Sequence, residues 1–157
     1  MKSPSKLSKK FIHLGLVALI TIIIFSAILS PVSIDGKSME PTYRDSAFTL
    51  INRLNYAFKP PVRGEIVAIK LAGRRLMFLK RIIGLPGETV TIRDGQVSID
   101  DTPLVEPYLI SPWPWNLAAR VLTAEEYFVI GDNRRQPMEQ HFFGRVYKQQ
   151  IIGRALW

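Results

Sequence analysis

The stretch LMFLKRIIGLPGETVTIRDGQVSID, residues 76–100, decides the fold. Short runs rich in β-branched and apolar residues alternate in it with turn signals, a pattern typical of antiparallel strands. Gly84-Leu85-Pro86-Gly87 predicts a turn that ends one strand and begins the next. Asp94-Gly95 is a strong signal for a two-residue hairpin turn. The predicted strands are Leu76–Gly84, Thr89–Arg93 and Gln96–Ile99.

The same pattern continues on both sides of this stretch. Further β-rich runs are Ala47–Asn52, Glu65–Lys70, Tyr127–Ile130 and Ile151–Leu156. Leu117–Glu126 is the one weak helical candidate after Pro31. We therefore expect a mainly β domain over residues 31–157, an antiparallel structure of coiled sheets or barrel-like form. At about 125 residues it is large enough for one hydrophobic core.

Composition excludes several kinds of chemistry. The chain has 157 residues, 47% of them hydrophobic, with no cysteine, two histidines and a formal charge of +8. Disulfides, thiolate metal sites and a cysteine nucleophile are therefore impossible. With only His13 and His141, a histidine-rich metal site is excluded, and we expect neither a metal nor an organic cofactor.

One segment is apolar enough to cross a membrane. Residues 11–29 contain no Lys, Arg, Asp or Glu, and as a helix they would span about 28 Å, close to the thickness of a bilayer core. Basic residues precede the segment, and Asp35 is the first charge after it. The positive-inside rule then predicts a cytoplasmic segment 1–10, a transmembrane anchor 11–30 and an extracytoplasmic domain 31–157.

The alternative for this segment is a cleavable signal peptide. Its apolar region would be shorter and would end at small residues of the Ala-x-Ala kind, whereas this run leaves through Ile28-Leu29-Ser30-Pro31. An uncleaved anchor is therefore favoured, and the lipid membrane is an expected partner. The lysines at positions 2, 6, 9 and 10 supply half of the net charge, so the basic composition is weak evidence for nucleic acid, which we do not expect as a partner.

Two tryptophans lie in a proline-rich segment. Pro112 and Pro114 exclude a central strand from residues 106–116, so Trp113 and Trp115 are expected on a loop or an edge. The indoles either cover a small core or contact a membrane interface, where indole rings are common.

Ser38 and Lys80 are candidates for nucleophilic chemistry. Ser38 stands between Gly36 and Pro41, so we expect it on a constrained turn. Strand alternation places Lys80 on the same face as Phe78 and Ile82. Burial on that face would lower the lysine pKa towards a neutral amine that accepts a hydroxyl proton. A surface hydroxyl and an edge or snorkelling lysine are the structural alternatives.

The neighbouring Arg81 points the other way along the strand and needs an anionic partner if it is covered. Asp132 is the candidate partner. It lies in Ile130-Gly131-Asp132-Asn133-Arg134, which by itself predicts a strand end and a polar turn.

These segments, in this order behind an apolar span, resemble the type I signal peptidases, which are membrane-bound Ser-Lys proteases of bacteria and of mitochondrial inner membranes. The matching stretches are Gly36-Lys37-Ser38-Met39-Glu40-Pro41-Thr42, Arg63-Gly64-Glu65-Ile66-Val67, Leu79-Lys80-Arg81-Ile82-Ile83-Gly84-Leu85-Pro86-Gly87-Glu88, Gly131-Asp132-Asn133-Arg134 and Phe143-Gly144. Each motif alone is weak, but their order behind an anchor is specific.

The resemblance implies that Ser38 is the nucleophile and Lys80 the general base. It also implies that the backbone N–H of Ser38 stabilises the oxyanion, with Gly36 beside it, and that Met39 lines the substrate groove. Arg81 with Asp132 matches a structural ion pair near the site. Asn133 and Arg134 complete that motif.

The chain departs from the family pattern after Arg134. Where a Ser-x-Asp-Ser-Arg run is usual, it has Pro137-Met138-Glu139-Gln140-His141. Pro137 stands where a hydroxyl often hydrogen-bonds the lysine, so an orienting contact is lost. Glu139 and His141 replace the Asp and Arg, and we expect them to retain at most a weak, pH-dependent pair.

The sequence thus predicts a membrane-bound serine endopeptidase that removes signal peptides from exported precursor proteins, its partners. The expected location is the bacterial plasma membrane, with an organellar inner membrane as the alternative. A catalytically impaired relative that tethers an exported partner, and a peptidase dedicated to one substrate, are the alternative functions. The sequence does not specify an oligomeric state.

Overall fold

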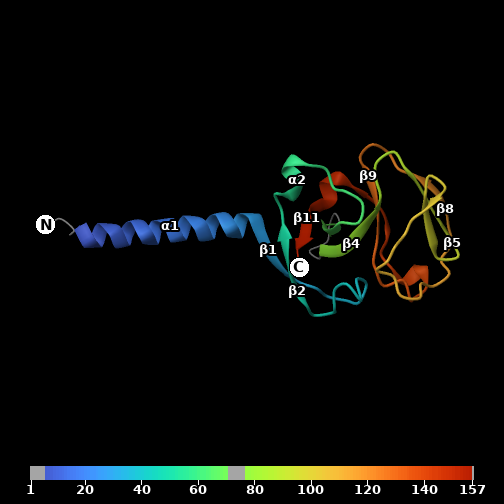
Figure 1. Ribbon diagram of the computed structural model, residues 1–157, viewed down its shortest axis with the longest axis horizontal. Coiled ribbons are helices and arrows are strands. Elements are labelled where there is room, and N and C mark those ends of the chain that lie inside the picture. Colours follow the sequence, from blue (N-terminus) through green and yellow to red (C-terminus); the bar gives the residue numbers. More distant parts are fainter. Residues whose placement is uncertain (1–5, 71–76, 157) are drawn as a thin grey trace.

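The computed structural model describes residues 6–70 and 77–156. A long helix projects from a body of β-strands, and one end of the body lies against the end of the helix (Figure 1). The helices are α1 (Lys6–Ile28) and α2 (Asn55–Phe58), with short 3-10 turns at Met138–Gln140 and Lys148–Gln150. The strands are β1 (Leu29–Ser33), β2 (Phe48–Asn52), β3 (Ile66–Lys70), β4 (Met77–Gly84), β5 (Thr89–Arg93), β6 (Gln96–Ile99), β7 (Thr102–Pro103), β8 (Leu117–Val121), β9 (Glu126–Ile130), β10 (Gly144–Tyr147) and β11 (Ile151–Leu156).

From residue 11 to its end at Ile28, helix α1 has no Lys, Arg, Asp or Glu on any side. Lys10–Ile28 is long and apolar enough to cross a membrane, with a mean hydropathy of 2.6 and no residue buried by the rest of the described chain. The hydroxyls of Thr21 and Ser26 donate to the carbonyls of Val17 and Ile23 within the helix. Such local bonds satisfy polar groups in an apolar environment.

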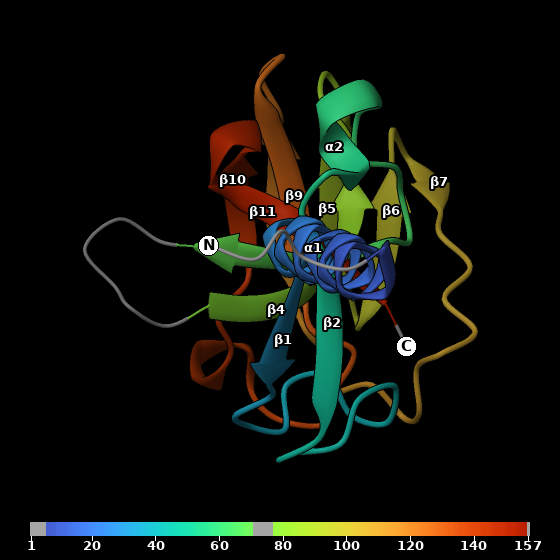
Figure 2. The ribbon, with the colours of Figure 1, turned by 90° about the vertical axis from the view of Figure 1, so that its left-hand side faces the viewer.

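A seven-stranded antiparallel sheet forms most of the body, in the order β1-β2-β11-β3-β4-β9-β10. Seen along α1, β1 and β2 lie side by side next to the helix (Figure 2). Strands β3, β4 and β9 lie inside the sheet, and every side chain of β9 is buried. Central strands covered on both faces are expected to be continuously apolar, and IVAIK and EYFVI come close to that pattern.

A four-stranded sheet, in the order β7-β6-β5-β8, forms the end of the body away from α1 (Figure 1). The predicted hairpin is present, since β5 pairs with β6 across Asp94 and Gly95. Both turn residues have positive φ angles, 47° and 83°, as a two-residue turn of this hand requires. One hydrophobic cluster joins the two sheets, with Val90 and Val97 from the small sheet against Phe128 and Ile130 from the large one.

The mainly β prediction is confirmed, and the predicted strands recur within a residue or two of their expected ends in the described part of the chain. Residue 76 lies outside the described residues. The helix predicted at Leu117–Glu126 is wrong: its first half is strand β8, paired with β5. Leu117, Ala118 and Ala119 favour a helix locally, but pairing with β5 outweighs that preference. The pattern also missed β1, an edge strand that contains Pro31.

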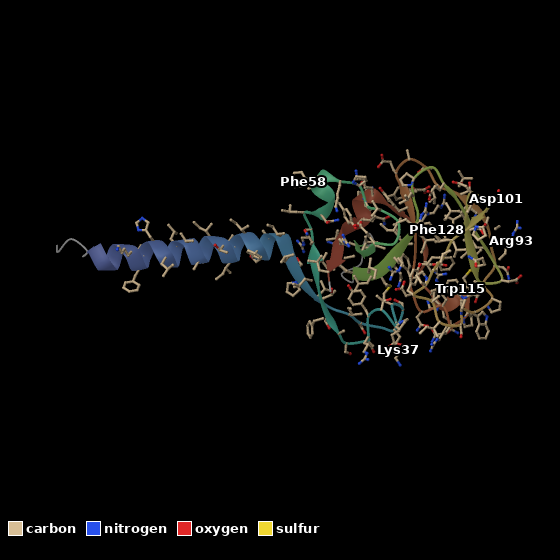
Figure 3. The ribbon with its side chains drawn as sticks, viewed as in Figure 1. Lys37, Phe58, Arg93, Asp101, Trp115 and Phe128 are labelled. Atoms are coloured by element: carbon tan, nitrogen blue, oxygen red, sulfur yellow. The ribbon has the colours of Figure 1, made fainter. Side chains whose placement is uncertain are left out.

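The segment 106–116 is a loop, as predicted. Trp115 is only 2% exposed and belongs to the cluster between the sheets, in the part of the body far from α1 (Figure 3). Trp115 therefore covers the core, and the alternative of a membrane contact is wrong for this residue. Trp113 is 49% exposed.

Candidate active site

Ser38 lies on a turn between β1 and β2. Gly36 begins the turn with a φ of 98°, a conformation that favours glycine, and its N–H donates to the Asp45 carboxylate at 2.8 Å. The next residue after Ser38, Met39, is 1% exposed and packs into a cluster with Ile51 and Leu79. A side chain buried beside Ser38 thus fixes the turn to the large sheet.

The Gly131–Arg134 segment, which follows β9, holds the same turn from the other side. The N–H of Asn133 donates to the Ser38 carbonyl, and its side-chain amide donates to the Lys37 carbonyl, both at 3.0 Å. Gly131 packs so closely that a Cβ atom there would run into the Ser38 carbonyl oxygen. A side chain at position 131 would therefore displace the serine.

Lys80 comes from the middle of β4, between β3 and β9. Its side chain is 2% exposed, and its Nζ donates to the Oγ of Ser38 at 2.6 Å. Burial lowers the lysine pKa to about 8, while the nearby Asp132 carboxylate acts in the opposite direction. The structure thus brings together the two residues selected from the sequence, with an amine close to losing its charge.

Arg81 and Asp132 form the expected ion pair. Arg81 donates through Nε to Oδ1 at 2.8 Å and through Nη2 to Oδ2 at 2.6 Å. The Thr42 hydroxyl donates to Oδ2 of the same carboxylate at 2.5 Å. The guanidinium of Arg81 also lies 3.9 Å from the centre of the Tyr108 ring. The pair therefore ties β4, the Ser38 turn and the Gly131–Arg134 segment together.

A second ion pair anchors that segment to the 106–116 loop. Arg134 donates to the Glu106 carboxylate at 2.6 Å, and both side chains are buried. It also donates to the Gly131 carbonyl at 3.0 Å, and Tyr108 donates its hydroxyl to Glu106 at 2.5 Å. Sequence reasoning missed Glu106 and Tyr108, since nothing in the pattern of a proline-flanked loop links it to Arg134.

The chain after Arg134 is held by Trp115. Its indole N–H donates to the Gln136 carbonyl at 2.7 Å, and its ring lies 5.0 Å from the imidazole of His141. Phe142 stacks on Phe78 of β4 at 5.0 Å. In the part of the chain that the structure describes, Glu139 and His141 form no ion pair, and Glu139 is exposed. Packing on Trp115 and Phe78 therefore holds this segment, in place of the weak Glu139–His141 pair.

Two hollows share Ser38. The smaller one, of about 70 Å³, is mostly apolar and is lined by residues that include Val32, Met39 and Leu79. The larger one, of about 340 Å³, is lined by Lys80, Gln136 and His141 among others. An extended peptide can therefore reach the serine hydroxyl with space on both of its sides.

A hydroxyl beside a buried, weakly basic amine is suited to nucleophilic attack, because the amine can take the hydroxyl proton. This chemistry on an antiparallel β body is that of a serine hydrolase. The comparisons with known proteins agree. Residues 8–157 match the family model "Signal peptidase, peptidase S26".

Individual relatives cover nearly the whole chain. It is 35% identical to a signal peptidase I of Leptolyngbya laminosa over 99% of this chain and 80% of the relative. It is 34% identical to a probable signal peptidase I-1 of a Synechocystis strain, over 99% and 84% respectively. The crystal structure of a signal peptidase I from Enterococcus faecalis, 31% identical, superposes with a TM-score of 0.50 over 61% of this chain and 97% of that one.

The fold and the matches together define a serine endopeptidase, a hydrolase. The chain belongs to the signal peptidase I family, peptidase family S26. The activity of that family is the removal of signal peptides.

Proposed function

We propose that the protein is a membrane-anchored signal peptidase in which Ser38 is the nucleophile and Lys80 the general base. The distance of 2.6 Å between Nζ and Oγ is the observation that carries this proposal. Burial favours the neutral amine, and a neutral amine at this distance can accept the serine proton. Membership of a serine peptidase family supports the same assignment.

The reaction then runs in two halves. Lys80 takes the hydroxyl proton as Oγ attacks the peptide carbonyl, and the resulting ammonium gives that proton to the leaving amine as the C–N bond breaks. In the second half, Lys80 takes a proton from the water that attacks the acyl-serine ester. It returns this proton to Oγ as the ester C–O bond breaks and the signal peptide is released. The backbone N–H of Ser38, beside Gly36, is the candidate oxyanion donor, and one such donor contributes about 3 kcal/mol.

The smaller hollow suggests which side chain precedes the cleaved bond. Its volume of about 70 Å³ and its lining by Val32, Met39 and Leu79 suit a small apolar side chain. Precursors that end their signal peptide in alanine are the matching substrates. Arg81, Asp132, Asn133 and Arg134 act by holding the serine turn against β4 and do not contact the reacting atoms.

The proposed topology has residues 1–10 in the cytoplasm, the anchor over 11–30 and the domain 31–157 outside. Helix α1 ends at Ile28, and the carbonyl of Ile28 accepts a bond from the N–H of Arg53 beside β2. The β body therefore begins where the apolar helix ends, and exported precursors would be cleaved close to the membrane surface. A bacterial plasma membrane is the proposed location.

The test uses the full-length chain in detergent with a precursor that carries an Ala-x-Ala signal peptide. We expect cleavage after the second alanine by the wild type and loss of cleavage, by at least a thousandfold, in both Ser38→Ala and Lys80→Met. Thr21→Ala, which changes a hydroxyl of the apolar helix far from Ser38, is the control. Retained cleavage in either site variant would overturn the assignment, and capture of the precursor without cleavage by the wild type would indicate a tether.

A further inference from the structure

The larger hollow beside Ser38 is not explained by the two-residue mechanism. Its volume of about 340 Å³ is enough for a large amino-acid side chain, and part of its wall comes from the chain after Gly131–Arg134. Phe142, stacked on Phe78, forms part of it. Among the described residues that line the two hollows, Lys80 belongs to the larger one only.

The path of the proton decides which part of the substrate lies there. The ammonium of Lys80 must give its proton to the amine that leaves, so that amine must come within hydrogen-bond reach of Nζ. The leaving amine is the N-terminus of the released chain. It therefore lies on the Lys80 side of Ser38, and its first side chain is directed towards the larger hollow.

The wall of this hollow is partly polar, with amide side chains beside the rings of Phe78 and Phe142. Gln136 and Gln140 are exposed residues in it, whereas Asn133 is half-buried and its amide donates to the Lys37 carbonyl. The imidazole of His141 packs on Trp115, and its Nε2 is buried with no hydrogen-bond partner among the described residues, so a side chain in the hollow would meet the ring through Nδ1. A charged imidazole would carry a proton on this buried nitrogen with no acceptor for it, which costs free energy. The ring is therefore neutral.

The charged groups around the hollow agree with a neutral imidazole. Burial, and then the cations Lys80 and Arg134, hold the pKa of His141 below its usual range. Arg134 is paired with Glu106. At the rim, Asp35 and Lys37 carry opposite charges. The hollow therefore offers hydrogen bonds without a net charge when Lys80 is neutral.

We propose that this hollow receives the first residue of the released chain, and that His141, Gln136 and Gln140 give it a preference for an uncharged, hydrogen-bonding side chain. This inference rests on the proposed function, because it uses Lys80 as the group that protonates the leaving amine. His141 stands where the family usually has arginine, so the preference belongs to this chain and its like.

The test measures kcat/KM for the full-length enzyme in detergent micelles on four peptides. All end their signal part in Ala-x-Ala, and the next residue is Gln, Leu, Glu or Lys. We expect Gln to be preferred over the similarly sized Leu by about tenfold, the value of one good hydrogen bond, and over Glu and Lys by more.

Two variants assign the preference to His141. His141→Phe keeps an aromatic ring on Trp115 and should bring the Gln-to-Leu ratio down severalfold. His141→Arg places a fixed cation in the wall and should raise the rate on Glu relative to Gln severalfold. Glu139→Gln is the matched control, since Glu139 is exposed in the same turn and lies outside the hollow, and it should leave all ratios unchanged.

The outcomes separate this inference from the proposed function. If the wild type cleaves all four peptides equally, or if both His141 variants change every rate by one common factor, the subsite is overturned while the peptidase stands. If Ser38→Ala cleaves as well as the wild type, the proposed function itself fails.

Discussion

The Nζ of Lys80 lies 2.6 Å from the Oγ of Ser38, although 42 residues separate them in the chain. One comes from the interior of a sheet and the other from a turn between two strands at its edge. Hydrogen bonds from Asn133 fix the turn, and pairing with β3 and β9 fixes the lysine. The scaffold on both sides is thus rigid, which pre-organises the two groups for proton transfer.

The first prediction concerns the pH dependence of cleavage. Only neutral Lys80 can accept the serine proton, and its pKa is about 8. We therefore expect kcat/KM to fall about tenfold for each pH unit below that value and to level off above it. Asp132 raises this pKa, so Asp132→Asn, if folded, should move the inflection to lower pH. A pH–rate profile that shows no inflection between pH 7 and 9 would contradict Lys80 as the base.

The second prediction concerns stability. The pKa of Lys80 is about 8 when folded, against an ordinary value of 10.5, so the folded chain binds fewer protons than the unfolded chain between these values. The difference corresponds to a cost on the order of 3 kcal/mol below pH 8, which disappears as the pH rises to 10.5. Lys80→Met should therefore be more stable than the wild type at pH 7, by up to about that amount.

Denaturant unfolding of both proteins at pH 7 and pH 10.5 tests this expectation. The advantage of the methionine variant should shrink at the higher pH. Equal advantages at the two pH values would mean that improved packing, and not removal of a buried charge, explains the effect.

The third prediction concerns the Arg81–Asp132 pair. The carboxylate of Asp132 is fully buried, so Arg81→Met would leave it with Thr42 as its remaining side-chain donor among the described residues. We expect a loss of 3–5 kcal/mol in the free energy of unfolding, about the usual result of breaking a buried pair. The double variant Arg81→Met/Asp132→Leu should recover much of this loss, because no buried charge remains. A double-mutant cycle measured by denaturant unfolding checks both values, and additive losses would argue against coupling.

Local sequence patterns predicted most of the strands. They did not predict the long-range contacts that hold the active-site residues in place. The β5–β6 hairpin follows from Asp94-Gly95 because two residues decide the turn. The burial of Lys80 follows from strand alternation, although alternation alone did not separate it from a snorkelling lysine. Its nearness to Ser38 came from a family resemblance, since no local rule relates a turn to a strand so far along the chain.

The residues that sequence reasoning missed act over long distances. Glu106 pairs with Arg134 across 28 residues, and a buried pair of this kind has no periodicity to reveal it. The strand β8 was missed because Leu117–Val121 has good helix formers, whose small preferences lose against pairing with β5. The sequence predicted at most a weak pair between His141 and Glu139. The packing of the imidazole on Trp115 depends on how the two sheets meet, which no local pattern shows.

The last prediction concerns Trp115, which supports the wall of the active site in place of the usual Ser-x-Asp-Ser-Arg run. Its indole N–H donates to the Gln136 carbonyl, and its ring contacts His141 and Phe143. Trp115→Phe keeps an aromatic ring but leaves that carbonyl without its donor. We expect the free energy of unfolding to fall by about 1–3 kcal/mol, and kcat/KM to fall severalfold because the turn beside Lys80 is less well held.

Trp113→Phe is the matched control, because Trp113 is half exposed in the same loop and the bond from its backbone N–H to Arg134 does not depend on the ring. It should change neither quantity measurably. Thermal unfolding and peptide cleavage, measured on both variants at one pH above 8, provide the comparison. If the two variants behaved alike, the indole bond to Gln136 would have no part in holding the wall of the site, and the replacement of the usual run by an aromatic support would have to be abandoned.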